Sequence, residues 1–151
     1  MAEKHPLSER EFWEIYRKVP RLTVEIIIRS DQGVLLTLRD IEPCIDMWHL
    51  PGGTVRFAEH LTDAVKRIAK RELSIDVLGT KLLGYIEYPS HYENGLDSPV
   101  GIAFEVTKYQ GTIKQNKEAK KYGWFKDLPK EMHQEQKDFL AKTVFIDKPL
   151  N

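Results

Sequence analysis

The sequence predicts an α+β protein in which a mixed β-sheet is combined with one central helix and with a helix near each terminus. Three patterns support this prediction. A run of β-branched residues over 22–28 indicates a strand, apolar residues at three- and four-residue steps over 61–73 indicate an amphipathic helix, and the composition of 130–143 favours a closing helix. We expect one domain over 1–151, because a chain of 151 residues can bury a core without disulfide bonds.

The first expected element is a short amphipathic helix over 8–18. Ser8 and Glu11 have the three-residue spacing of a capping box, in which each side chain bonds a backbone N–H at the helix start. The helix should end before Pro20, which cannot continue it. Its aromatic side chains would pack either on the rest of the domain or on a second subunit.

The expected strands are short and separated by turn residues, and they lie at 22–28, 34–38, 48–50, 54–57, 82–88, 101–108 and 122–125. The turn residues at 31–33 should join the first two strands into a β-hairpin. The Pro-Gly-Gly at 51–53 is expected to interrupt regular structure, since proline lacks a donor and glycine favours turns. The polar segment 89–98 should form a loop.

Composition excludes several classes of protein. The chain is 41% hydrophobic and 30% charged, which is typical of globular proteins, and Lys plus Arg equals Asp plus Glu at 23 each. The overall charge therefore gives no reason to expect nucleic acid or a membrane surface as a partner. No apolar run approaches the roughly 18 residues of a membrane span, and the single cysteine, Cys44, cannot form an intrachain disulfide. Cytoplasmic location is the default expectation.

The central helix carries a carboxylate on its apolar side. At about 100° per residue, Glu72 projects close to Val65 and Ile68. A buried unpaired charge costs several kcal/mol or more, so such a group is normally paired with a base, bonded to donors or bound to a cation. Two readings remain open: Glu72 reaches solvent or pairs with Arg71 or Arg67, or it holds a metal ion.

A glycine pair and three charged residues give this carboxylate a context. Gly52 and Gly53 let the backbone approach a ligand, and an exposed carbonyl of such a bend is a hard oxygen suited to Mg²⁺. A Pro-Gly-Gly alone is usually a turn. A carboxylate six residues later at Glu59 and an arginine eight further at Arg67, followed by Glu72, make a less common pattern.

This pattern resembles the signature of the Nudix hydrolase family. Six positions match it without a gap: Gly53, Glu59, Arg67, Ala69, Glu72 and Ile75. Ile68 and Arg71 stand where the family has glutamates, and Ser74 where it has glycine. The resemblance extends over about 22–129, because the Trp-x-x-Pro-Gly-Gly of 48–53, and later Glu118 with the Trp-Phe and Leu-Pro pairs, also match. It implies a Nudix fold, an α/β/α sandwich with a mixed β-sheet, a central loop-helix-loop motif and flanking terminal helices.

The resemblance also implies a metal site. In the family, helix glutamates collect Mg²⁺ around a diphosphate, and the positions of Glu72 and of the Gly52 carbonyl are ligands. Because two helix glutamates are absent, we expect one Mg²⁺, with Mn²⁺ as an alternative ion. Ile68 should enter the core, whereas Arg71 either contacts phosphate or lies in solvent. Glu118 is a candidate metal ligand or proton acceptor, or else a solvated loop carboxylate.

In lacking these two glutamates while keeping the last one, Glu72, the sequence resembles the GDP-mannose mannosyl hydrolase branch of the family. Its substrate-contacting positions match Phe12, Glu25 and Arg39, and Arg39 would face the charge of the leaving diphosphate. Two positions depart from this branch: Thr54 replaces an arginine, and Glu118-Ala119 replaces a Gln-His pair. His91, a loop histidine, is a further candidate for substrate contact or proton transfer, or else incidental.

The expected function is Mg²⁺-dependent hydrolysis of a nucleoside diphosphate linked to another moiety, above all a nucleotide sugar such as GDP-mannose. Two alternatives stay open: an ordinary phosphoanhydride hydrolase of nucleoside triphosphates or dinucleotides, and a nucleotide-binding domain without turnover. The expected partner is a small-molecule nucleotide, with neither nucleic acid nor membrane. The helix over 8–18 suggests a homodimer, although packing within one subunit explains its apolar residues equally well.

Overall fold

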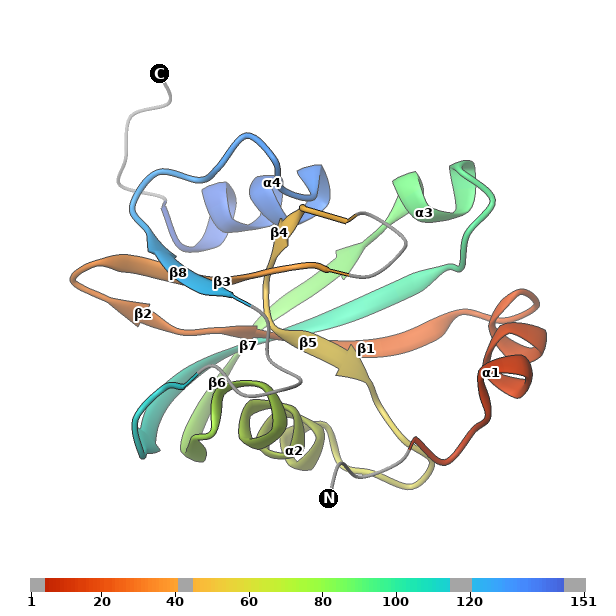
Figure 1. The fold of residues 1–151 in the computed structure, drawn as a ribbon, viewed down its shortest axis with the longest axis horizontal. Coiled ribbons are helices and arrows are strands. Elements are labelled where there is room, and N and C mark those ends of the chain that lie inside the picture. The colour runs from red at the N-terminus through yellow and green to blue at the C-terminus, as the bar shows by residue number, and fades with distance from the viewer. Residues whose placement is uncertain (1–4, 41–44, 115–120, 146–151) are drawn as a thin grey trace.

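The computed structural model describes residues 5–40, 45–114 and 121–145. Two four-stranded sheets lie between helices (Figure 1). The helices are α1 (Glu9–Tyr16), α2 (Leu61–Leu73), α3 (Pro89–Glu93) and α4 (Gln134–Thr143). The strands are β1 (Arg21–Ile27), β2 (Arg29–Ser30), β3 (Gly33–Leu38), β4 (Trp48–His49), β5 (Gly52–Thr54), β6 (Asp76–Glu87), β7 (Pro99–Gln110) and β8 (Tyr122–Phe125).

The first sheet is mixed, as the sequence predicts. Its strand order is β5-β1-β7-β6, with β1 and β7 parallel and the other neighbours antiparallel. The second sheet is antiparallel and centres on β3, which pairs with β2 and β4 along one edge and with β8 along the other. The sequence did not indicate that the strands divide between two sheets.

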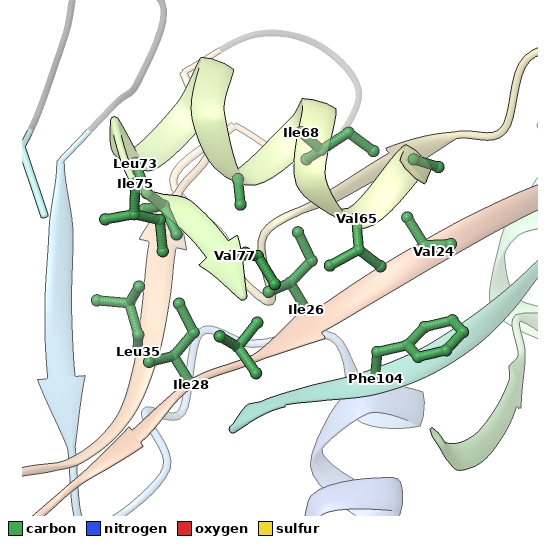
Figure 2. Close-up of a cluster of buried hydrophobic side chains, with 13 residues drawn as sticks. Val24, Ile26, Ile28, Leu35, Val65, Ile68, Leu73, Ile75, Val77 and Phe104 are labelled. Carbon is green, nitrogen blue, oxygen red and sulfur yellow. The ribbon is translucent and has the colours of Figure 1, made fainter. Parts of the chain in front are cut away.

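Two apolar clusters fill the space on either side of the mixed sheet. The first joins α2 to side chains of β1, including Val24 and Ile26, and to Phe104 of β7 (Figure 2). The second contains Ile27 of β1 and Leu140 of α4. Since consecutive strand residues point to opposite faces, β1 supplies both clusters. The helices on both faces confirm the predicted α/β/α arrangement.

Helices α1 and α2 confirm two local sequence patterns. At α1, Ser8 accepts from the Glu11 backbone and Glu11 accepts from the Ser8 backbone, so the predicted capping box is present. At α2, Ala64, Val65, Ile68, Ala69 and Leu73 are buried, which confirms the amphipathic pattern and places Ile68 in the core. α1 spans fewer residues than the expected 8–18: Ser8 is its N-cap, and Arg17, still right-handed at φ −78° and ψ −12°, is its C-cap.

Several boundaries differ from the sequence prediction. The glycine pair does not interrupt the strand: Gly52 and Gly53 belong to β5 and pair with Glu25 and Val24 of β1. The antiparallel hairpin forms between β2 and β3, whereas β1 pairs with β5 and β7. Long-range pairing extends β6 and β7 beyond their apolar cores, which local patterns could not reveal.

Two further segments differ near the candidate site. The expected loop 89–98 contains the short helix α3, which begins at Pro89, a residue suited to the first helical position. α4 begins at Gln134 rather than near 130, because Met132 makes a parallel β-bridge with Trp48. Cys44 and Glu118 lie outside the described residues. No helix within the described ranges is long and apolar enough to cross a membrane.

Candidate active site

A cavity of about 390 Å³ lies where β1 and β5 meet α1, the α3 segment and the start of α4. Several residues singled out from the sequence line it together: Phe12, Glu25, Arg39, Gly52, Gly53 and His91. Residues that the sequence analysis did not single out line it too, among them Arg21, Tyr88, Asp97, His133 and Gln136. A volume of this size falls within the range of small-molecule pockets.

Glu25 is a buried carboxylate, 7% exposed, on β1. A side chain at either of two neighbouring glycines would displace it: a Cβ on Gly52 would lie 2.6 Å from Glu25 Oε2, and one on Gly101 would lie 2.7 Å from Oε1. The register explains the contact, since Glu25 pairs directly with Gly52. The glycine therefore serves close approach within a strand rather than a turn.

Hydrogen bonds fix one oxygen of this carboxylate. Tyr88 donates to Glu25 Oε1 at 3.0 Å and Thr23 donates to the same atom at 3.1 Å. Burial raises the pKa of Glu25 to about 7, against these hydrogen bonds and the charge of Arg21, which lower it; the charge of Glu72 raises it further. The group therefore titrates near neutral pH, which is typical of functional sites as well as of buried ion networks.

The network continues from Tyr88 into α4. Gln136 Nε2 donates to the Tyr88 hydroxyl at 3.0 Å, and Gln136 Oε1 accepts from the Leu50 backbone N–H at 2.8 Å. Burial and the neighbouring Glu25 carboxylate raise the pKa of Tyr88. Tyr88 thus remains a hydroxyl donor, and α4 holds both it and the residue before Pro51 in place.

Glu72, the first predicted metal ligand, lies in the last turn of α2. Its Oε1 is 3.6 Å from Arg71 Nη2, its Oε2 is buried, and its side chain is 21% exposed. Glu72 does not itself line the cavity described above. Its charge contributes to the raised pKa of Glu25, so the carboxylate on α2 lies within electrostatic range of the carboxylate on β1.

The other two charged residues of the signature make a structural contact. Arg67 donates to both oxygens of Glu59 at 2.8 and 2.9 Å, and its Nη2 also donates to the Thr54 carbonyl at 3.0 Å. The Arg67 hydrogen bond leads the causes that lower the pKa of Glu59. This pair fastens the segment between β5 and α2 onto the helix. It accounts for both residues without a ligand.

Arg21, Asp97 and His91 form a second connected group on the cavity wall. Arg21 Nε donates to Asp97 Oδ2 at 2.6 Å, and His91 Nδ1 lies 3.0 Å from Asp97 Oδ1. Burial would raise the pKa of Asp97, but the His91 hydrogen bond and the Arg21 charge outweigh it, so the pKa falls to about 2. Asp97 is therefore an ionised carboxylate whose side chain is almost fully buried.

Arg21 also places its guanidinium beside Thr54. Its Nη1 donates to Thr54 Oγ1 at 2.8 Å, and its guanidinium carbon lies 5.5 Å from the Phe12 ring centroid. Thr54 stands where the GDP-mannose mannosyl hydrolase branch has an arginine. A guanidinium therefore reaches this part of the cavity from the neighbouring strand β1, where it also contacts an aromatic ring of α1.

Three histidines line the remaining wall. The His91 and His133 ring centroids are 5.5 Å apart. Burial lowers the pKa of His133, as do the charges of His91 and Arg39, against the effect of Glu135. His49 is engaged through both ring nitrogens, with Nδ1 2.8 Å from the Leu50 carbonyl and Nε2 3.5 Å from Thr37 Oγ1. Arg39, which follows β3, lines the same cavity as these histidines.

The residues near Gly52 suit a divalent cation. Gly52 approaches the Glu25 carboxylate more closely than a residue with a Cβ could, and the charge of Glu72 acts on the same carboxylate. Carboxylate and carbonyl oxygens are the ligands that Mg²⁺ prefers. Among residues 5–40, 45–114 and 121–145, no cluster of three or more His, Cys, Asp or Glu side chains gathers around one point. The predicted set includes Glu118, which lies outside these ranges.

Comparison with known proteins identifies the family. A model described as "NUDIX domain" matches residues 19–143, and the chain therefore belongs to the NUDIX domain family. The structure is similar to the crystal structure of a MutT NUDIX hydrolase from Burkholderia pseudomallei, with a TM-score of 0.75 and 27% identity over 83% of this chain and 98% of that chain. The family resemblance and the fold predicted from the sequence are both confirmed.

Two curated relatives add names. The low-salt glycan biosynthesis protein Agl8 of Haloferax volcanii is 44% identical over 100 residues, which are 63% of this chain and 64% of that protein. The ADP-ribose pyrophosphatase of Methanocaldococcus jannaschii is 31% identical over 113 residues, which are 74% of this chain and 66% of that protein. The matched regions span just under two thirds of the length of either relative.

The residues that sequence reasoning missed share a cause. Arg21 and Asp97 are 76 positions apart, and Tyr88 and Gln136 are 48 positions apart. No local spacing connects such pairs, so only the fold brings them together. One signal was available at Asp97, a carboxylate within the polar segment that also contains His91.

Proposed function

We propose that this protein is a Mg²⁺-dependent hydrolase of a nucleoside diphosphate linked to another moiety, with nucleotide sugars as the preferred substrate class. One observation carries the proposal: Glu25, Gly52 and Arg39 line the same cavity, and the Glu72 carboxylate lies near Glu25. A carboxylate and a glycine backbone that suit a cation thus line the same cavity as an arginine that suits phosphate.

The candidate residues have separate proposed roles. Glu72, the Gly52 carbonyl and Glu118 would hold the Mg²⁺, which neutralises diphosphate charge when bound. Arg39 would face the diphosphate and stabilise negative charge on the leaving oxygen. Phe12 would stack on a flat part of the substrate, and Glu25 would accept hydrogen bonds from its polar groups.

The site favours one metal ion over several. Two positions at which the family has helix glutamates are taken by Ile68, which is fully buried, and by Arg71, which adds positive charge. A cluster of cations needs several carboxylates to balance it, and these substitutions remove two. With one ion, more of the diphosphate charge is left for Arg39.

The name of the Haloferax relative, a low-salt glycan biosynthesis protein, supports the sugar-linked substrate. The name of the Methanocaldococcus relative supports a second candidate function, cleavage of a phosphoanhydride in a dinucleotide-like substrate such as ADP-ribose. A third candidate, nucleotide binding without turnover, follows from the substituted glutamates. In the first candidate water attacks either carbon or phosphorus, whereas in the second it attacks phosphorus.

A substrate panel with Mg²⁺ tests these candidates. Nucleotide sugars, ADP-ribose and nucleoside triphosphates are incubated with the protein, and products are separated by chromatography. Single-turnover hydrolysis in ¹⁸O-water then locates the attack, since label in the sugar hydroxyl means carbon and label in phosphate means phosphorus. Cleavage of triphosphates but not of nucleotide sugars would refute the leading proposal. Tight binding without hydrolysis would favour the third candidate.

Glu72→Gln tests the metal role within the same assay. The substitution removes one negative charge and keeps the shape, so we expect Mg²⁺ affinity and turnover to fall by at least tenfold. Asp63→Asn is the matched control, because Asp63 is an exposed carboxylate in the first turn of the same helix. If Glu72→Gln retains the Mg²⁺ affinity and turnover of Asp63→Asn, the metal assignment is wrong.

A homodimer formed through α1 is part of the proposal. None of the residues of α1 is buried, and Ile15, on its surface, is 40% exposed. The aromatic side chains of α1 contact one another, with Phe12 4.7 Å from Tyr16 and 5.5 Å from Trp13 between ring centroids, and Phe12 also contacts Arg21. Sedimentation equilibrium of the full chain would measure this association.

A further inference from the structure

His91 and Asp97 form a hydrogen-bonded dyad on the cavity wall, apart from the proposed metal ligands. Asp97 is 5% exposed and accepts from Arg21 through its other oxygen. An ionised carboxylate only accepts hydrogen bonds, so the 3.0 Å contact requires the proton to be on His91 Nδ1. The Nε2 atom of the neutral ring then carries a lone pair. The hydrogen bond of the ring to Asp97 uses Nδ1 and not Nε2.

The ring of His91 is held by its surroundings. It packs against Tyr88 and His133 at centroid distances of 5.4 and 5.5 Å. The backbone of α3 is anchored as well, because Ser90 N–H donates to Glu135 Oε1 at 3.0 Å. A base held in one orientation needs little reorganisation to take a proton.

We propose that His91, oriented by Asp97, is the general base that activates water in the cavity. The inference rests on the proposed function and adds a catalytic residue to it. One proton of the water moves to His91 Nε2, and the water oxygen forms a bond to the electrophilic carbon or phosphorus atom. The bond from that atom to the leaving oxygen breaks, and the leaving oxygen keeps the electron pair. Asp97 stays ionised and stabilises the imidazolium, as a positioning residue.

The other histidines of the cavity are less suited to this role. His49 has both ring nitrogens engaged by Leu50 and Thr37. The charge of Glu135 acts on His133, but the Glu135 carboxylate accepts a hydrogen bond from the Ser90 backbone N–H. Glu135 therefore does not orient His133 as Asp97 orients His91. His91 combines a bonded Nδ1, a buried anionic partner and a place on the cavity wall.

A purely structural role is the competing explanation, since the Arg21, Asp97 and His91 contacts also join α3 to β1. Chemical rescue separates the two explanations. His91→Ala leaves a space that free imidazole can enter, so a lost base is replaced by an added one, whereas a lost structural contact is not. His91→Gln, which fills the space and keeps a donor for Asp97, serves as a second variant. Tyr92→Ala is the matched control, because Tyr92 is 54% exposed on the same helix.

With the nucleotide that the wild-type protein hydrolyses, we expect His91→Ala to lower kcat by about 10²- to 10⁴-fold while KM changes less than threefold. Imidazole should restore turnover in proportion to its concentration, and more basic imidazoles should restore it better. Asp97→Asn should lower kcat at least tenfold without rescue. Tyr92→Ala should match the wild type.

Three outcomes would overturn the inference. His91→Ala could keep wild-type kcat, it could raise KM alone, or its lost activity could resist imidazole while the folded His91→Gln variant stays active. If the wild-type protein hydrolyses no nucleotide, the proposed function fails first and this inference falls with it. Activity in the wild type together with activity in His91→Gln would refute only the role of His91.

Discussion

The buried carboxylate of Glu25 links the stability of the fold to ligand binding in the cavity. Its carboxylate is placed by two glycines and two hydroxyl donors, yet burial still raises its pKa to about 7. Folding thus favours the protonated form of this group, while a metal or a hydrogen-bond donor of a substrate favours the charged form. The cost of burying the charge is therefore lowered when ligand binds.

We expect this cost to appear as a pH-dependent loss of stability in metal-free protein. The folded pKa of Glu25, about 7, exceeds the unfolded value of 4.5, so the folded state holds the extra proton between these values. Its contribution is fully present below pH 4.5 and is lost as pH rises through 7. The loss by pH 8 is on the order of 3 kcal/mol.

Urea unfolding in EDTA at pH 5 and pH 8 measures this loss. Other groups titrate in the same range, so the wild type is compared with Glu25→Gln, which cannot ionise. We expect the wild type to lose stability relative to the variant as the pH rises. Parallel pH curves for the two proteins would contradict the raised pKa of Glu25.

At the scale of residues, the sequence revealed those whose role depends on neighbours in the same segment. Glu72 and Ile68 were placed correctly on their helix because a helix repeats every 3.6 residues. The contacts of Asp97 and Gln136 depend on partners far along the chain, so no periodicity encodes them. Whether Glu72 and Arg39 act as proposed stays a prediction.

At the scale of elements, the C-terminal end of α2 has a strained backbone. At its C-terminus, Ser74 adopts a left-handed conformation with φ 61° and ψ 28°, at the position where the family signature has glycine. A side chain with a Cβ is strained there by roughly 1–2 kcal/mol. Glycine relieves this strain but gives the unfolded chain more freedom.

Ser74→Gly should therefore stabilise the protein by about 0.5–1 kcal/mol, because the relieved strain exceeds the entropy cost. Ser74→Ala is the control, since alanine keeps the Cβ and the strain. Midpoints of chemical denaturation for the three proteins measure the difference. Equal stability of Ser74→Gly and Ser74→Ala would contradict strain at the helix end.

The contact between Glu59 and Arg67 is expected to stabilise the segment ahead of α2. Both side chains are largely buried, at 14% and 15% exposure, and the contact uses two hydrogen bonds. We expect Arg67→Met to cost about 2–3 kcal/mol, because it leaves a buried carboxylate without its partner. A double-mutant cycle with Glu59→Gln isolates the coupling of the pair.

Lys70 and Asp76 provide the comparison for that cycle. They form an ion pair that also involves α2, at 3.1 Å, but their side chains are 61% and 59% exposed. Lys70→Met should cost less than about 1 kcal/mol, because solvent screens an exposed pair. Equal losses for Arg67→Met and Lys70→Met would show that burial adds nothing to the first contact.

Elements with a strong local pattern were predicted well, and those fixed by distant partners were not. The apolar stripe of α2 and the capping box of α1 are both read from residues within one or two turns. β5 runs through two glycines because β1 offers a paired strand with room for them. Tertiary pairing overrode the turn preference of glycine there.

At the scale of the whole molecule, the cavity exists only because distant elements meet. Its wall combines residues from β1 and β5 with others from α1, the α3 segment and α4. The ends of these elements are joined by hydrogen bonds that cross the fold, such as the one between Gln136 and Leu50. Occupation of the cavity by a ligand should therefore stabilise the entire fold rather than a single element.

Thermal unfolding with Mg²⁺ and a nucleoside diphosphate should show this coupling. Each ligand at about 100 times its Kd stabilises the folded state by about 2.7 kcal/mol, which corresponds to a rise in Tm of roughly 5–10 °C for a domain of this size. The rise in Tm that the nucleotide causes should be smaller when EDTA removes Mg²⁺. In Glu72→Gln this rise should be equally small with and without Mg²⁺. Asp63→Asn should behave as the wild type. If the nucleotide raises Tm equally in EDTA and in Mg²⁺, the diphosphate binds through arginine alone, and the carboxylates near Gly52 hold no ion that the ligand shares.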